Sequence, residues 1–301
     1  MMANDNLKGA LLMTASMGAF TLNDVFVKLL AEDIPLFQIV FLRSVGTAIL
    51  LAVAAAAMGQ LRLRPGPGDR ARLTWRTLFE VATMVAFLYA LVNMPIANAT
   101  AILAALPLSV TLAAAVFLKE PLGWRRMSAV LVGFAGVMLI VQPGTDGFNA
   151  FSLSAMLAVV FITGRDLVTR GMGPGLPSLG VALVTAVGVG AVSLILSLFQ
   201  TWVAIDLRAA FFIACSSFFI IGGYLFSIMV MRVGEVSVVA PFRYTGLVFA
   251  LIFGLLFFAE WPNALALLGA GLVVATGVYA IVRERAVMAR RTAATAAQSP
   301  P

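Results

Sequence analysis

The chain has 301 residues, of which 62% are hydrophobic and only 11% are charged, and its formal net charge is +7. Soluble domains carry roughly 25% charged residues, so this composition excludes a water-soluble protein and indicates one surrounded by lipid. The basic residues lie in short segments between apolar runs, which excludes nucleic acid as the partner of this positive charge. One cysteine, Cys215, and no histidine leave no disulfide and no Cys/His metal site, and we expect no cofactor.

Apolar segments follow one another along the whole chain, each close to the about 20 residues that a transmembrane helix requires. Charged residues or Pro and Gly separate them. The predicted spans are 7–30, 36–58, 74–93, 96–118, 124–142, 150–170, 178–200, 209–231, 236–258 and 263–282. The sequence therefore predicts an all-α integral membrane protein with ten transmembrane helices, followed by a disordered cytoplasmic tail over 283–301.

Basic residues mark one side of the membrane. They gather in the segment 59–73, in the segment after the fourth span and in the C-terminal tail. Four loops that fall on the other side contain no Lys or Arg, namely those near 31–35, 94–95, 143–149 and 259–262. Because cytoplasmic loops carry the excess of Lys and Arg, we expect both termini in the cytoplasm of a bacterium and a multi-pass protein of its inner (plasma) membrane.

The first and sixth spans share a pattern of polar residues and proline. A threonine, an aspartate, a basic residue and a proline recur 142 positions later, so that Thr21, Asp24, Lys28 and Pro35 correspond to Thr163, Asp166, Arg170 and Pro177. Each half holds five spans, an odd number, so the second half enters the membrane in the opposite sense. The sequence thus predicts two inverted five-helix repeats, 7–142 and 150–282. Chance similarity between apolar segments is the alternative.

Several short motifs at matching places in the halves resemble a known family. They are Phe-Leu-Lys-Glu-Pro at 117–121, Phe-Phe-Ala-Glu at 257–260, the Gly-Val pairs at 136–137 and 277–278, and the segment 234–241. The chain is similar in these motifs to the drug/metabolite transporter superfamily, specifically to the EamA type with two five-helix units. The resemblance implies that fold and a transport function. It leaves the solute open among amino acids, nucleotide-sugar-like compounds, vitamins such as riboflavin and other metabolites.

Ionisable residues within the predicted spans are costly, at about 2.5–3.5 kcal/mol for Arg, Lys or Asp at a helix centre. They include Asp24, Lys28, Arg43, Glu80, Arg165, Asp166 and Arg243. Asp24 and Lys28 share a helix face, either as the polar lining of a transport path or as a self-neutralising pair. Glu80 follows Arg76 by one helical turn and is interpreted as its ordinary ion-pair partner.

Arg43 and Arg243 each lie about two turns into a predicted span and have no acidic residue within four positions. Arg43 and Arg243 must therefore find a partner on another helix or on a ligand, and a guanidinium suits a carboxylate, a phosphate or an aromatic ring. Pro241 precedes Arg243, and Pro107 lies in the fourth span. A helix broken by proline beside a charge is typical of a transport site, although a plain kink is the alternative.

Polar and charged side chains at membrane depth define the predicted binding site. An apolar pocket with a few such groups suits a flat or partly aromatic organic solute better than a hydrated ion. The predicted substrate-binding residues are Asn23, Asp24, Arg43, Tyr89, Asn93, Asn98, Arg165, Asp166, Tyr224, Arg243 and Tyr244. We expect them around a cavity between spans one, three, four, six, eight and nine.

These features together predict a secondary transporter that moves a small organic metabolite by alternating access. The sequence has no P-loop, so a gradient or exchange must drive transport, and any proton coupling must use Asp24, Asp166 or Glu80. Riboflavin-like vitamins or amino acids are candidate solutes, and a metabolite or drug exporter or an exchanger is the alternative. A membrane-embedded enzyme or a scaffold is the alternative from another class, but the absence of histidine and the dispersed acids argue against catalysis. The expected partners are the solute and membrane lipid, and a homodimer is left open.

Overall fold

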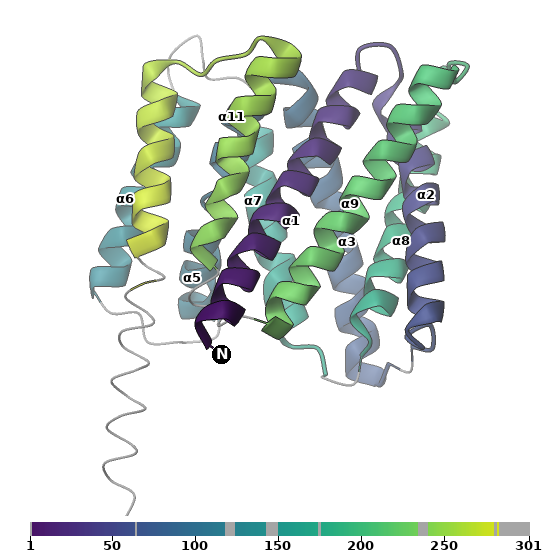
Figure 1. Ribbon diagram of the computed structural model, residues 1–301, viewed down its shortest axis with the longest axis horizontal. Coiled ribbons are helices and arrows are strands. Elements are labelled where there is room, and N and C mark those ends of the chain that lie inside the picture. Colours follow the sequence, from purple (N-terminus) through teal and green to yellow (C-terminus); the bar gives the residue numbers. More distant parts are fainter. Residues whose placement is uncertain are drawn as a thin grey trace, which may run out of the picture.

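The computed structural model describes residues 2–63, 65–117, 124–142, 150–173, 176–233, 240–279 and 282. Within these residues every regular element is helical, which confirms the predicted all-α class (Figure 1). The first half contains α1 (Met2–Leu30), α2 (Leu36–Ala57), α3 (Pro67–Asn93), α4 (Ile96–Leu103), α5 (Leu106–Phe117) and α6 (Trp124–Val141). The second half contains α7 (Ala150–Arg170), α8 (Ser178–Ser197), α9 (Leu207–Val233), the 3₁₀ segment η1 (Ala240–Tyr244), α11 (Thr245–Phe258) and a last helix, Ala264–Tyr279. The predicted tail, 283–301, lies outside the described residues.

Seven stretches of helix in the described part of the chain are long and apolar enough to cross a membrane. Three further apolar helices are shorter, namely Met127–Val141, Phe242–Phe258 and Ala264–Tyr279. Large apolar side chains such as Leu11, Phe218 and Leu256 are exposed on the outside of the bundle, where lipid covers them. The prediction of a multi-pass membrane protein is therefore confirmed, whereas the number of ten crossings stays a prediction.

Prolines set the points at which three helices begin. Pro35, Pro95 and Pro177 directly precede α2, α4 and α8, and each has an extended backbone conformation. The residue before a proline avoids helical conformation, so these helices cannot extend further towards the N-terminus. Pro35 and Pro177 are the corresponding prolines of the two halves, and both act in the same way.

The fourth predicted span is broken in the structure. Helix α4 ends at Leu103, α5 begins at Leu106, and a turn occupies 104–105 between them. Pro107 accounts for the break, because its ring clashes with the carbonyl of residue 103 and it offers no N–H to continue the helix. The described part of the ninth predicted span is also irregular, because the 3₁₀ turn of η1 directly precedes α11.

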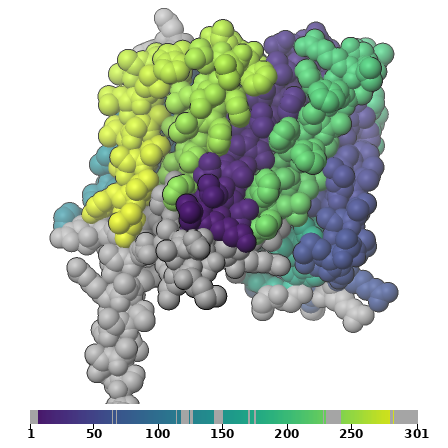
Figure 2. All heavy atoms as spheres, in the orientation of Figure 1, coloured from purple at the N-terminus to yellow at the C-terminus, as the bar shows by residue number. Residues whose placement is uncertain are grey.

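Helices of the two halves alternate in the bundle. Helix α1 packs along α9, α3 packs along α7, and α2 packs along α8. Figure 2 shows α1, in purple, between α9 in green and α11 in yellow-green. The halves are thus interleaved, and a space between them is lined by both.

Hydrogen bonds at both ends fix the relative direction of α3 and α7. The Ser154 hydroxyl near the start of α7 donates to the Ala86 carbonyl at 2.8 Å, towards the end of α3. The Gly173 amide, just after α7, donates to Asp69 Oδ1 at 3.1 Å, at the start of α3. The two helices therefore run antiparallel. The C-terminal end of α3 also meets that of α1, because Lys28 Nζ donates to the Met94 carbonyl at 2.6 Å.

Candidate functional site

A cavity of about 350 Å³ lies inside the bundle, between helices of both halves. Its walls come from α1, α2, α3, α4, α5, α7, α8, α9, η1 and α11, so α2 and α8 join the spans expected from the sequence. The polar and charged lining residues are Thr21, Asn23, Asp24, Arg43, Ser44, Thr47, Arg76, Glu80, Thr83, Thr100, Arg165, Thr185, Tyr224, Arg243 and Tyr244. A pocket of roughly 300–1,000 Å³ is typical of sites for small organic molecules.

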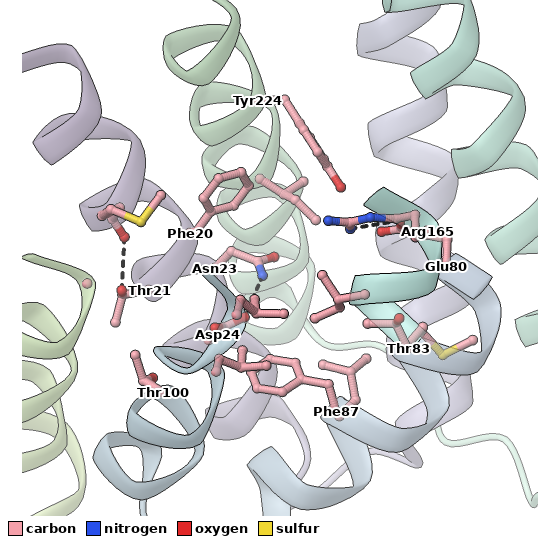
Figure 3. A pocket seen from close by; sticks show the side chains of 18 of the residues that line it. Phe20, Thr21, Asn23, Asp24, Glu80, Thr83, Phe87, Thr100, Arg165 and Tyr224 are labelled. Carbon is pink, nitrogen blue, oxygen red and sulfur yellow. Dashed lines mark hydrogen bonds and ion pairs between the residues drawn. The ribbon is translucent and has the colours of Figure 1, made fainter. Parts of the chain in front are cut away.

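Arg165 holds two carboxylates on one side of the cavity. Its Nη1 lies 3.0 Å from Oε2 of Glu80 on α3 (Figure 3). Its Nη2 lies 2.8 Å from Oδ1 of Asp166 on α7. The Nε–H of Arg165 also donates to Asp166, at 2.9 Å. One guanidinium therefore compensates two acids, and this cluster keeps one net negative charge.

Asn23 connects the opposite wall. Its Oδ1 accepts hydrogen bonds from Arg43 Nη1 at 3.2 Å and from the Ser216 hydroxyl at 2.8 Å, and its Nδ2 donates to Asp24 Oδ1 at 3.0 Å. The amide thus links α1, α2 and α9 while it separates the cation of Arg43 from the anion of Asp24. Within the described residues neither Asp24 nor Arg43 forms an ion pair. Neither side chain is therefore in direct contact with an opposite charge in the part of the chain that the structure describes.

Four buried polar atoms in the described residues have no hydrogen-bond partner, and all four belong to residues that line this cavity. They are Thr47 Oγ1, Arg76 Nε, Thr83 Oγ1 and Tyr244 Oη. Buried polar groups are normally satisfied, so a cluster of exceptions needs an explanation. Donors and acceptors that the protein does not use are what a binding cavity offers to a solute.

Aromatic side chains complete the wall. Phe20 and Tyr224 meet edge to face with ring centroids 5.3 Å apart, and Phe87 lies on the other side of the pocket (Figure 3). Figure 3 also shows the Tyr224 hydroxyl directed towards the guanidinium of Arg165. Such faces accept planar rings and cationic groups.

The structure brings seven of the predicted site residues together in the cavity lining, namely Asn23, Asp24, Arg43, Arg165, Tyr224, Arg243 and Tyr244. Asp166 is not part of the lining but holds Arg165 in place. Tyr89, Asn93 and Asn98 lie away from it. The ring of Tyr89 is exposed and packs against Phe151, and the Asn93 amide donates to the Tyr89 carbonyl at 2.8 Å.

Two local ion pairs that the sequence allows are replaced by longer-range pairs. Of the two interpretations of Asp24 and Lys28, the self-neutralising pair is wrong, since Lys28 binds Glu260 at 2.7 Å across the two halves. The expected pairing of Arg76 with Glu80 is also wrong, because Glu80 binds Arg165. A charged residue can pair with a partner one helical turn away or with a charge on another packed segment, and both residues here pair with the more distant segment. The side chain of Arg170 lies outside the described residues.

Sequence reasoning missed several polar lining residues, four of which contribute hydrogen-bonding groups that bear on the proposed site. Thr47, Thr83 and Thr185 are neutral and sit within apolar helices, where threonine gives no distinctive signal. The sequence interpretation of Arg76 was limited to an ion pair with Glu80. Its position inside the predicted span 74–93, where an uncompensated charge is costly, is the signal that could have placed it in the cavity. The described residues contain no group of three or more His, Cys, Asp or Glu that could hold a metal ion.

Comparison with known proteins gives a consistent result over nearly the whole chain. The model of the EamA-like transporter family matches twice, over residues 7–142 and 150–283. The S-adenosylmethionine uptake transporter of Rickettsia prowazekii is 25% identical over 295 residues, covering 96% of this chain and 98% of the relative. The pseudopaline exporter CntI of Pseudomonas aeruginosa is 26% identical over 275 residues, covering 91% and 96%.

A solved crystal structure shares the fold. It superimposes with a TM-score of 0.65 at 18% identity and covers 93% of this chain and 98% of its own. The family match spans both halves and agrees with the interleaved bundle and its central cavity. The protein therefore belongs to the EamA-like transporter family, whose members are transporters and not enzymes.

Proposed function

We propose that this chain is a secondary transporter for a small zwitterionic metabolite and that S-adenosylmethionine is the first solute to test. The observation that carries the proposal is the coexistence of unpaired charges of both signs in one cavity. Within the part of the chain that the structure describes, Asp24 bonds only to the Asn23 amide and Arg76 only to the Thr185 hydroxyl. A charge kept unpaired at membrane depth is costly and marks a place where something charged binds.

The chemistry of the solute matches these groups. S-Adenosylmethionine carries an ammonium, a carboxylate, a sulfonium and a planar adenine. A carboxylate such as Asp24 attracts cationic groups, an arginine fork binds a carboxylate, and aromatic rings accept both adenine and a sulfonium. The similarity to a relative named as an S-adenosylmethionine uptake transporter supports the same choice.

The proposed membrane topology has ten crossings in two inverted repeats, with both termini in the cytoplasm. The packing pattern supports a pseudo-twofold relation. A twofold rotation that exchanges α1 with α7, α2 with α8 and α3 with α9 would turn the contact between α1 and α9 into the contact between α7 and α3. The same rotation would leave the contact between α2 and α8 unchanged, and all three contacts are present. The antiparallel course of α3 and α7 supports inversion. The basic segment 59–73 supports the orientation.

Alternating access is the proposed mechanism, in which the interleaved halves expose the cavity to one side of the membrane and then to the other. The break between α4 and α5 and the 3₁₀ turn of η1 provide irregular backbone beside the cavity where such movement can take place. Proton coupling, where it occurs, is assigned to Asp24, because Glu80 and Asp166 are both held by Arg165.

Counterflow in proteoliposomes tests this function. Vesicles loaded with unlabelled S-adenosylmethionine are expected to accumulate the labelled compound, and Asp24→Asn should reduce accumulation about tenfold or more because it removes the anion that faces the cationic groups. Asp206→Asn is the matched control: Asp206 lies outside the cavity lining and caps α9 through the Ala209 amide at 2.7 Å, a role that asparagine also fills. If riboflavin or an amino acid shows counterflow and S-adenosylmethionine does not, that compound takes the place of S-adenosylmethionine as the proposed solute.

Export is the second candidate direction, and the relative named as a pseudopaline exporter favours it. Counterflow does not distinguish the two directions. Uptake into right-side-out vesicles and into inverted vesicles from the same cells does distinguish them, because a gradient-driven carrier accumulates solute in only one of the two preparations under a given gradient.

A further inference from the structure

Arg76 is a cation of the cavity whose hydrogen-bonding capacity is only partly used. It lines the cavity from α3, and its Nη1 donates to the hydroxyl of Thr185 on α8. Its Nε is buried and has no hydrogen-bond partner among the described residues. No ion pair joins Arg76 to an acid in that part of the chain, because Glu80, one turn further along α3, binds Arg165. Arg76 therefore brings an uncompensated positive charge to the cavity.

The unused donors of Arg76 lie on one edge of its guanidinium. Nε–H and Nη2–H form the edge that binds a carboxylate through two parallel hydrogen bonds. Thr185 takes the remaining nitrogen, Nη1, on the other side of the fork. The Thr185 hydroxyl donates in turn to the Val181 carbonyl at 2.9 Å, so its own orientation is fixed by α8. The contact holds the guanidinium, and no described residue accepts a hydrogen bond from the two-donor edge.

We propose that Arg76 receives the carboxylate of the transported solute and that Thr185 is its positioning residue. This inference rests on the proposed function, because it names the group of the solute that the cavity selects. Asp24 on α1 and Arg76 on α3 then form a two-point site for a molecule with a cationic group and a carboxylate. A solute without the carboxylate leaves the buried Nε–H unsatisfied and is rejected for that reason.

The test compares S-adenosylmethionine with decarboxylated S-adenosylmethionine, which lacks only the carboxylate. Wild-type protein in proteoliposomes is expected to prefer the first compound about tenfold to a hundredfold in KM, the range of a charge-assisted bidentate contact. Arg76→Gln is expected to abolish this preference by raising the KM of S-adenosylmethionine alone. Arg76→Lys, which keeps the charge but not the fork, restores only part of it. Thr185→Val raises the same KM by a smaller factor.

Arg72→Gln is the matched control. Arg72 lies one turn earlier on α3, is exposed, and binds Asp69 outside the cavity lining. The Arg72→Gln variant is expected to leave the KM values of S-adenosylmethionine and of its decarboxylated form unchanged. The proposal is overturned if Arg76→Gln lowers transport of both compounds equally, which is the mark of a structural role, or if it leaves the discrimination intact.

A second readout separates this inference from the choice of solute. Phenylglyoxal modifies accessible arginines, and peptide mass spectrometry reports the modified fraction of Arg76. Glycine is expected to protect Arg76 more than glycinamide does, because the two differ only in the carboxylate. Equal labelling with both overturns the role of Arg76 even where S-adenosylmethionine is transported. Selective protection by glycine without S-adenosylmethionine counterflow upholds the anion site and rejects only that solute.

Discussion

Lys28 and Glu260 form an ion pair between the two halves of the protein, although 232 positions separate them in the sequence. Lys28 Nζ lies 2.7 Å from Glu260 Oε1 and also donates to the Met94 carbonyl at 2.6 Å. Glu260 Oε2 accepts the Ile96 amide at 3.1 Å, which satisfies the first turn of α4. One ion pair therefore joins the ends of α1 and α3, the start of α4 and the segment after α11.

Removing one member of this pair is expected to destabilise the protein. The Lys28 side chain is only 10% exposed, so Glu260→Gln leaves a nearly buried ammonium without its counter-ion. Breaking a buried pair in this way costs about 3–5 kcal/mol, and we expect Tm in detergent to fall by several degrees. The reversed pair, Lys28→Glu with Glu260→Lys, should recover part of the loss.

The exposed pair of Arg72 and Asp69 is the control for this prediction. Its nitrogen and oxygen lie 3.3 Å apart, and the arginine side chain is 48% exposed. Arg72→Gln should therefore cost no more than about 1 kcal/mol. Equal falls in Tm for Glu260→Gln and Arg72→Gln would show that burial does not strengthen the pair of Lys28 and Glu260.

The cluster around Arg165 is expected to be strongly non-additive. Arg165→Gln leaves the carboxylates of Glu80 and Asp166 without their cation and should lower Tm more than Glu80→Gln, which leaves the pair of Arg165 and Asp166 intact. The triple variant with Glu80→Gln and Asp166→Asn removes all three charges. It should be more stable than Arg165→Gln alone, by roughly 1–3 kcal/mol of interaction energy.

Thermal unfolding of the four proteins in one detergent gives this comparison. A triple variant no more stable than Arg165→Gln would mean that the guanidinium acts through packing and not through charge. Arg165→Lys completes the set, because it keeps the charge but cannot bind both acids through a planar fork.

The class of the protein could be predicted from the sequence, but most side-chain partners could not. Apolar runs of helix length and the spacing of Lys and Arg depend on composition along the chain, and each described helix overlaps one of those runs, although α1, α3 and α9 extend beyond them. Pairing across helices depends on which faces meet. Lys28 had Asp24 one turn away but binds Glu260, and Glu80 had Arg76 but binds Arg165. No local pattern contains that information.

Charged members of the site were easier to predict than neutral ones. Asp24, Arg43 and Arg165 stand out because charge is rare in a span, and all three line the cavity. Thr47 and Thr83 do not stand out, since a threonine in an apolar helix usually bonds to its own backbone. Only the packed structure shows that their hydroxyls lack hydrogen-bond partners among the described residues.

Replacing these hydroxyls is expected to affect transport without lowering stability. Thr47→Val and Thr83→Val keep the shape of the side chain and remove a buried oxygen that has no partner. Tm should stay constant or rise, because an unsatisfied buried group costs about 1–3 kcal/mol. The KM for the transported solute should rise if these hydroxyls bind it.

Thr185→Val is the control for these two variants, because it is expected to lower Tm instead of leaving it unchanged. The Thr185 hydroxyl accepts from Arg76 and donates to the Val181 carbonyl, so its removal leaves partners unsatisfied and should lower Tm. A fall in Tm for Thr47→Val or Thr83→Val as large as that for Thr185→Val would contradict the assignment of free hydroxyls to the cavity.

Gly277 on the last helix keeps Tyr244 in place at the cavity wall. A Cβ at position 277 would overlap the phenol oxygen of Tyr244 and press on the ring, which is buried and lines the cavity. Gly277→Ala should therefore cost about 1–3 kcal/mol through overpacking and displace Tyr244, with a loss of transport. Tyr244→Phe in the same chain removes the overlapped oxygen and should restore part of the stability.

A substitution at Gly271, on the same helix, is the control that separates the contact with Tyr244 from the effect of alanine on helix propensity. A Cβ at position 271 meets no atom within 4 Å, so Gly271→Ala should stabilise the helix by up to about 1 kcal/mol and leave transport unchanged. Because alanine favours the helix equally at both positions, any difference in Tm between the two variants measures the contact with Tyr244. Equal gains in Tm, with transport intact in both, would show that Tyr244 moves aside freely and does not shape the cavity.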